Sequence, residues 1–105
     1  MDSKAFKRSL SAAVPPTGLS HALQALWWAE KGDWHKAHEC AQAQEDATGA
    51  WVHACLHREE GDLANAGYWY ARAGKPIAGG PLEVERDEIA RVLLDRPQIS
   101  LPRNE

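Results

Sequence analysis

The sequence contains the same two-residue bend twice: Gly32-Asp33 and, 29 residues later, Gly61-Asp62. Glycine readily adopts the left-handed conformation that ends a helix, and aspartate caps the start of the next one. On both sides of each bend, alanine, leucine and tryptophan recur at helical spacing. The chain is therefore expected to fold as two helical hairpins in tandem.

A shift of 29 residues also brings other identical residues into register. The matching pairs outside the bends are Ala25 with Ala54, Glu30 with Glu59, and Ala37 with Ala66. Self-similarity at a fixed period is typical of stacked helical repeats. Small residues at matched positions indicate where the two helices of a hairpin approach closely.

Five helices account for most of the chain. The hairpins predict helices over about 19–31, 34–45, 50–60 and 63–73. Pro81 favours the start of a fifth helix, because proline is preferred at the first helical position, and Pro97 ends it. No segment shows the period-two alternation of a half-buried strand. The predicted fold is all-α, a pair of hairpins with a C-terminal helix that caps the open end of the stack.

The length of 105 residues allows one small domain. We expect a helical repeat-like domain over residues 18–96, a flexible N-terminal tail over 1–17 and a short C-terminal tail over 97–105. The longest strictly apolar run, residues 25–29, is far shorter than the roughly 20 residues that span a bilayer. A membrane is therefore not an expected partner.

Charge and cysteine content narrow the function further. Twelve Lys and Arg against fifteen Asp and Glu give a formal charge of −3, which is unsuited to holding nucleic acid. Cys40 and Cys55 both lie within predicted helices rather than in a loop framework stapled by disulfides. We expect them to be reduced, which favours a cytoplasmic location.

Residues 61–74, which read Gly-Asp-Leu-Ala-Asn-Ala-Gly-Tyr-Trp-Tyr-Ala-Arg-Ala-Gly, resemble the second half of a Sel1-like or tetratricopeptide repeat. Those families place Gly-Asp at the turn, then a small residue, an aromatic pair and an alanine. Residues 32–37 resemble the same stretch of a first repeat, and the whole resemblance covers roughly residues 19–76. Residues 25–34 together with 51–70 also resemble a group of small bacterial proteins of unassigned function.

The resemblance implies a protein-interaction module rather than an enzyme. Such families bind proteins or peptides along a groove lined by the first helix of each hairpin. Carried over to this chain, the candidate groove residues are Leu26, Glu30, Trp51, Arg58 and Glu59. Two hairpins make a short groove, so we expect a weak interaction or one assisted by oligomerisation.

Five tryptophans are unusual in so short a chain. Neighbouring helical residues point about 100° apart, so Trp27 and Trp28 cannot both enter one core layer. Either the tryptophans form the core of a domain with little other apolar mass, or one of them is an exposed anchor for a partner. The best candidates for such an anchor are Trp27, which we take as the first choice, and Trp51. Surplus aromatic surface favours a homodimer.

Histidines offer an alternative function. His53 and His57 are separated by one helical turn and share a face, so they could bind a metal or small ligand if His21 or Glu60 completed the site. The glutamate of the zincin pattern is missing because position 54 is alanine. The other interpretation is that both histidines are packed and hydrogen-bonded between helices.

Catalytic motifs are missing from the sequence. It has no glycine-rich phosphate loop and no nucleophile elbow. Cys55 and His57 lie on one helix with side chains about 200° apart, which separates the thiol from the imidazole. The sequence predicts neither an enzyme nor a bound cofactor.

Overall fold

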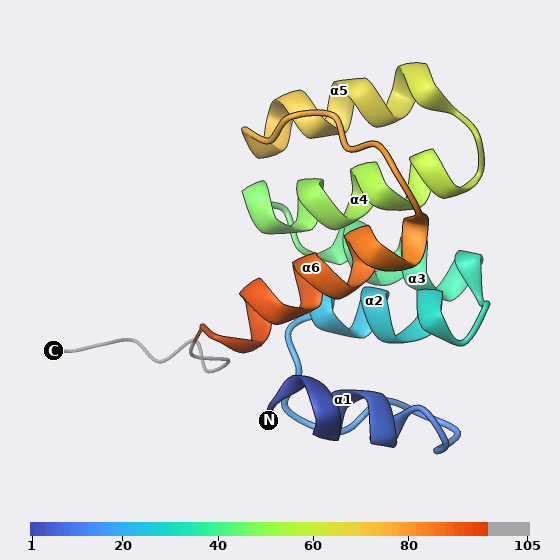
Figure 1. Ribbon diagram of the computed structural model, residues 1–105, viewed down its shortest axis with the longest axis vertical. Helices are drawn as coiled ribbons and strands as arrows, with labels where there is room; N and C mark the ends of the chain where they lie inside the picture. Colours follow the sequence, from blue (N-terminus) through green and yellow to red (C-terminus); the bar gives the residue numbers. More distant parts are fainter. Residues whose placement is uncertain (97–105) are drawn as a thin grey trace, which may run out of the picture.

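The computed structural model describes residues 1–96. Over this range the secondary structure consists of helices without strands, as predicted (Figure 1). The helices over this range are α1 (Ser3–Ser9), α2 (His21–Glu30), α3 (Trp34–Ala43), α4 (Ala47–Glu59), α5 (Leu63–Ala73) and α6 (Leu82–Leu94). The expected tail over 97–105 lies outside the described residues. No helix within residues 1–96 is both long enough and apolar enough to cross a membrane.

Both Gly-Asp bends lie at corners between antiparallel helices, as predicted. Gly32 has a φ of +85° and Gly61 one of +87°, in the left-handed region that favours glycine. In both bends the aspartate N–H donates to the carbonyl five residues before it, at 2.9 Å. The side chains of Asp33 and Asp62 then cap the helices that follow. The same residue pair thus makes the same corner twice, between α2 and α3 and between α4 and α5.

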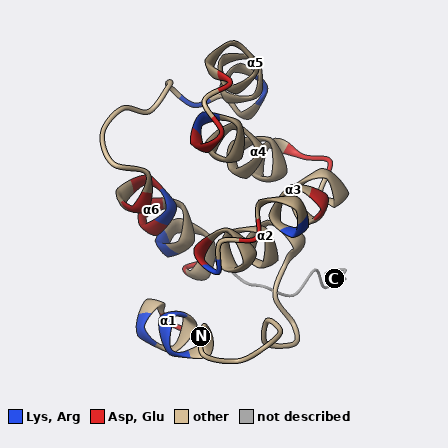
Figure 2. Cartoon of the chain, turned by 90° about the vertical axis from the view of Figure 1, so that its right-hand side faces the viewer, with Lys and Arg blue, Asp and Glu red and all other residues tan. Residues whose placement is uncertain are grey.

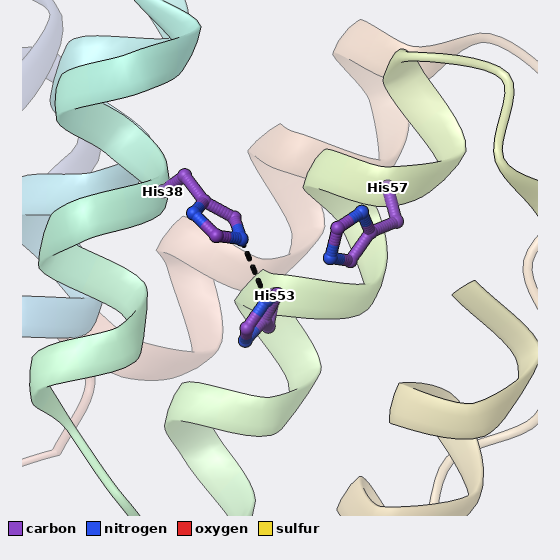
Figure 3. Close-up of side chains that lie close together, drawn as sticks. All are labelled: His38, His53 and His57. Atoms are coloured by element: carbon purple, nitrogen blue, oxygen red, sulfur yellow. Dashed lines mark hydrogen bonds between the residues drawn. The ribbon is translucent and has the colours of Figure 1, made fainter. Parts of the chain in front are cut away.

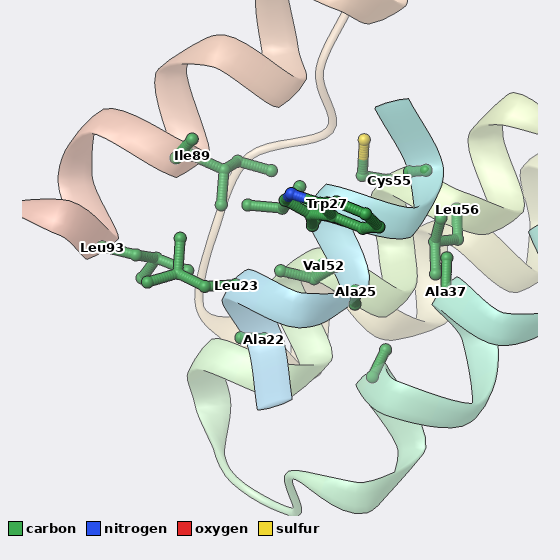
Figure 4. Close-up of a cluster of buried hydrophobic side chains, with 14 of the residues drawn as sticks. Ala22, Leu23, Ala25, Trp27, Ala37, Val52, Cys55, Leu56, Ile89 and Leu93 are labelled. Carbon is green, nitrogen blue, oxygen red and sulfur yellow. The ribbon is translucent and has the colours of Figure 1, made fainter. Parts of the chain in front are cut away.

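The main core surrounds Trp27 of α2, whose side chain is fully buried (Figure 4). Its indole Nε1 donates to Ser9 Oγ at 3.0 Å. The prediction of an exposed Trp27 anchor is therefore wrong, because this small domain uses its largest side chain to fill the interior. The large side chains that share this core are Phe6 of α1, Leu23 and Leu26 of α2, Val52 and Leu56 of α4, and Ile89 and Leu93 of α6.

A helix occupies part of the segment that we expected to be a flexible tail. Asp2 caps α1 by accepting from the Ala5 N–H at 2.8 Å, and Phe6 is buried in the main core. The Lys31 ammonium donates to the carbonyls of Leu10 and Ala12, at 2.7 and 3.0 Å. The segment is therefore held at both ends, by one buried ring and by one lysine.

Helix α6 exists where the sequence predicts a fifth helix, but it does not cap the end of the stack. It lies across α2 and α4, the first helices of the two hairpins (Figure 1). Ile89 and Leu93 pack into the same core as Trp27, because this core lies open along α2 and not beyond α5. The non-helical residues 75–81 connect α5 to it.

Candidate functional site

The candidate groove residues lie on α2 and α4, and the chain's own α6 packs across these two helices. Leu26 is only 1% exposed, in the core that α6 closes. Trp51 is half-buried and packs against the main core and against a smaller buried cluster of Ala54, Ala66 and Tyr70. The Lys75 ammonium lies 4.3 Å from its ring centroid. Neither side chain offers the open groove surface that was expected.

The three charged candidates of the groove all bind side chains of α6. Arg58 Nη1 lies 2.9 Å from Glu85 Oε1. Arg86 pairs with Glu30 at 2.8 Å and with Glu59 at 3.1 Å. Figure 2 shows acidic and basic residues along α6, where it faces the ends of α2 and α4. These pairs fix the position of α6 by charge as well as by apolar packing.

Glu85 is the centre of this contact and is only 4% exposed. Tyr70 Oη donates to Glu85 Oε2, and Arg58 neutralises the carboxylate. Burial, reinforced by Glu85, raises the pKa of the Cys55 thiol and that of the Tyr70 phenol. A buried carboxylate is tolerated only with such partners, and Arg58 and Tyr70 supply them here.

A second cluster lies on another side of α4, between the two hairpins (Figure 3). His38 of α3 meets His53 and His57 of α4, and one ligand nitrogen from each lies within 4.8 Å of the others. The Nε2 atoms of His38 and His53 are 2.9 Å apart, a hydrogen bond in which one ring donates. His53 and His57 are 4% and 6% exposed. The two predicted histidines are therefore both buried and joined by a third.

Aromatic rings hold the cluster on both sides. Trp34 stacks on His38, with ring centroids 4.7 Å apart, and Trp69 of α5 stacks on His53 at 3.9 Å. His53 and His57 are themselves stacked at 4.8 Å, with an angle of 23° between the ring planes. The imidazoles thus belong to a continuous series of ring contacts that connects α3, α4 and α5.

The two predicted third ligands have different outcomes. Glu60 is beside the cluster, where its Oε2 accepts from His57 Nδ1 at 2.7 Å. His21 is exposed at the start of α2 and is not part of it. His38, which shares helical spacing with His35 in the sequence, was not predicted to be the third imidazole, although Ala37 and Ala41 mark the buried face of α3 that it borders.

Burial disfavours the charged forms of His38 and His53. It lowers the pKa of His53 to about 4, and the neighbouring rings of His38 and His57 add to the effect. The pKa of His38 is also lowered, by burial first and then by His57. His38 and His53 are therefore neutral at pH 7.

A cavity of about 600 Å³ reaches the cluster at His53. It lies among the end of α3, the start of α4 and the outer helix α5. Its lining includes Gln44, Glu45, His53, Trp69 and Arg72. The cavity connects an otherwise covered imidazole with solvent.

Comparison with known proteins finds no match to this chain. No family model, no curated protein and no solved structure matches it. The resemblance to Sel1-like and tetratricopeptide repeats therefore stays a prediction, and the functional argument rests on the geometry of the groove and the histidine cluster.

Proposed function

We propose that the chain is a small helix-binding interaction module that self-associates by exchanging α6 between two copies. The observation that carries the proposal is the packing of α6 across α2 and α4. Three groove residues that the resemblance implicates, Glu30, Arg58 and Glu59, bind α6 through ion pairs. An amphipathic helix in a groove between helices is a common mode of recognition between proteins.

The second copy is the occupant that this groove fits. Each copy carries the same α6, with Glu85 for Arg58 and with Ile89 and Leu93 for the core. Exchange would preserve all of these contacts and change only the path of the chain. Domain swapping is for this reason a low-cost route to dimers.

The segment that links α5 to α6 is suited to such an exchange. Residues 75–81 contain no helix, and their sequence includes Pro76, Gly79, Gly80 and Pro81. A short tether favours closure within one chain at low concentration, because the effective concentration of the attached helix is high. The proposed equilibrium is therefore a closed monomer that gives way to a swapped dimer as concentration rises.

A charge exchange across the groove tests the proposal. The Arg58→Glu chain opposes its own Glu85 with a second carboxylate, and the Glu85→Arg chain opposes its own Arg58 with a second cation. Mixed in equal amounts, each groove can hold the partner's α6 with opposite charges. We expect light scattering to give monomers for each chain alone and a one-to-one dimer for the mixture.

The chain with both substitutions is the matched control, since it restores the pair within one molecule and should fold and dimerise with concentration as the unchanged chain does. If that control folds while the mixture stays monomeric, exchange of α6 is refuted. If the control does not fold, deletion of residues 77–79 in the otherwise unchanged chain replaces it. Shortening the link should then raise the dimer fraction, and an unchanged fraction refutes the exchange.

The partner class, the location and the fold family that we propose are those expected from the sequence. The partner is a protein, not nucleic acid or a membrane, because the formal charge is −3. The location is cytoplasmic, which agrees with Cys40 and Cys55 being free thiols. The fold is read as a degenerate Sel1-like or tetratricopeptide-like pair of hairpins without catalytic activity.

A further inference from the structure

We infer that His38, His53 and His57 form a binding site for a transition-metal dication of the zinc class. The site lies between the hairpins and is separate from the groove that holds α6. Two ligands one turn apart on α4 and a third from α3 give a set that no single helix could supply. A bound ion would join the first hairpin to the second.

The spacing of the nitrogen atoms is close to what such an ion requires. Zinc–nitrogen bonds of 2.0–2.1 Å at tetrahedral angles place two ligand nitrogens about 3.3 Å apart. The separation of His38 Nε2 from His53 Nε2 is 2.9 Å, and no ligand pair exceeds 4.8 Å. The closest pair must open slightly and the widest must close by about 1.5 Å.

Ring rotation can supply these movements. Metal ligation uses lone pairs in the plane of each imidazole, so His53 and His57 must turn out of their mutual stack. His38 is only half-buried and can follow them. The hydrogen bond between His38 and His53 is then replaced by two bonds to the metal.

The surroundings of His57 select the tautomer that a metal needs. Glu60 Oε2 accepts a hydrogen bond from the His57 Nδ1–H at 2.7 Å, while Asn65 Nδ2 approaches Nε2 at 3.4 Å as a donor. Both contacts place the lone pair of the ring on Nε2, and a metal would have to displace the long Asn65 hydrogen bond from this atom. A carboxylate on the distal nitrogen is the usual second-shell partner of a metal-binding histidine.

The chemistry of the donor atoms decides which ions the site would prefer. All three are imidazole nitrogens. Such donors suit Zn²⁺, Co²⁺, Ni²⁺ or Cu²⁺ and do not suit Mg²⁺ or Ca²⁺, which prefer oxygen.

The cavity at His53 gives such an ion a path from solvent. Its volume of about 600 Å³ is large compared with the roughly 30 Å³ that one water occupies in the liquid. His53 lines this cavity and His38 and His57 do not, so an ion would approach the cluster past the His53 ring. Ligand set, tautomer and entry path all come from residues of this one chain.

Titration of the purified full-length chain with Co²⁺ and Zn²⁺ tests the inference. We expect one ion per chain, the visible absorption of four-coordinate Co²⁺, and a rise in melting temperature with Zn²⁺. His38→Ala should lose at least tenfold in affinity, because it removes one of the three ligands. His38 is the most exposed of the three, so its loss should disturb the fold least. Glu60→Gln should lose about tenfold to a hundredfold, as second-shell changes do.

His35→Ala and His21→Ala are the matched controls, because both histidines are exposed and lie outside the cluster. Both should bind like the unchanged chain. The site is refuted if the folded chain binds no ion stoichiometrically, or if His38→Ala binds unchanged while a control variant loses the ion. Circular dichroism of each variant separates loss of a ligand from loss of the fold.

Discussion

The two hairpins have the same corners but different side chains beside them. Gln24 and Trp28 of the first hairpin occupy the positions that His53 and His57 hold 29 residues later. Trp28 is half-buried beneath the Lys36 ammonium, which lies 4.3 Å from its ring centroid. His53 and His57 instead face α3 of the first hairpin and meet His38 there. The bends thus determine the path of the backbone, while the residues between them determine which hairpin contributes two histidines to the cluster.

The largest expected difference between the hairpins lies in the core. Trp27 and Leu56 are matched by the shift of 29, and both are fully buried. We expect Trp27→Ala to lower the free energy of unfolding by about 5 kcal/mol and Leu56→Ala by about 3 kcal/mol, because the larger side chain leaves the larger cavity. Urea unfolding measures both, with Trp27→Phe as a milder variant. Equal losses would contradict the central place of Trp27.

Acid should affect the second hairpin more than the first. The unfolded chain protonates His53 near pH 6.5, whereas in the folded chain the pKa of His53 is about 4. Stability is therefore lost as pH falls from 6.5 to 4, by roughly 3 kcal/mol for this one group. Urea unfolding across this range should give a flatter profile for His53→Gln and an unchanged one for His21→Gln. A profile that His53→Gln leaves unchanged would exclude this histidine as the cause.

The smallest expected difference is at the corners. An added Cβ at Gly32 or Gly61 would meet no atom within 4 Å, so only the positive φ opposes alanine. We expect each Gly→Ala change to lower the free energy of unfolding by about 1–2 kcal/mol, equally in the two hairpins. Thermal unfolding of the two single variants and the double variant checks both equality and additivity. Clearly unequal losses would mean that the two bends contribute differently to the free energy of unfolding.

Local signals in the sequence predicted the corners correctly. A Gly-Asp pair specifies its own turn, because the left-handed glycine and the capping aspartate act within a few residues. Helices α2 to α5 follow from the same local rules. The helix α1 was missed because its one large buried side chain, Phe6, gives no periodic pattern.

Tertiary placement could not be predicted in the same way. Arg58 and Glu59 were predicted to face a partner, but the side chains that they bind, Glu85 and Arg86 of α6, each lie 27 residues away along the chain. His38 joined the histidine cluster through the packing of α3 on α4, a contact without a sequence motif. Trp27 was misread for a related reason, since spacing alone does not say which of two adjacent tryptophans faces the interior.

The position of Cys55 has a practical consequence. Its thiol is 1% exposed, and burial together with Glu85 raises its pKa. Thiols react as thiolates, so Cys55 stays inert toward alkylating reagents while α6 covers it. In a Cys40→Ser background, the rate of labelling at Cys55 measures how often α6 separates from α2 and α4. The chain thus carries its own reporter of how often the groove is empty.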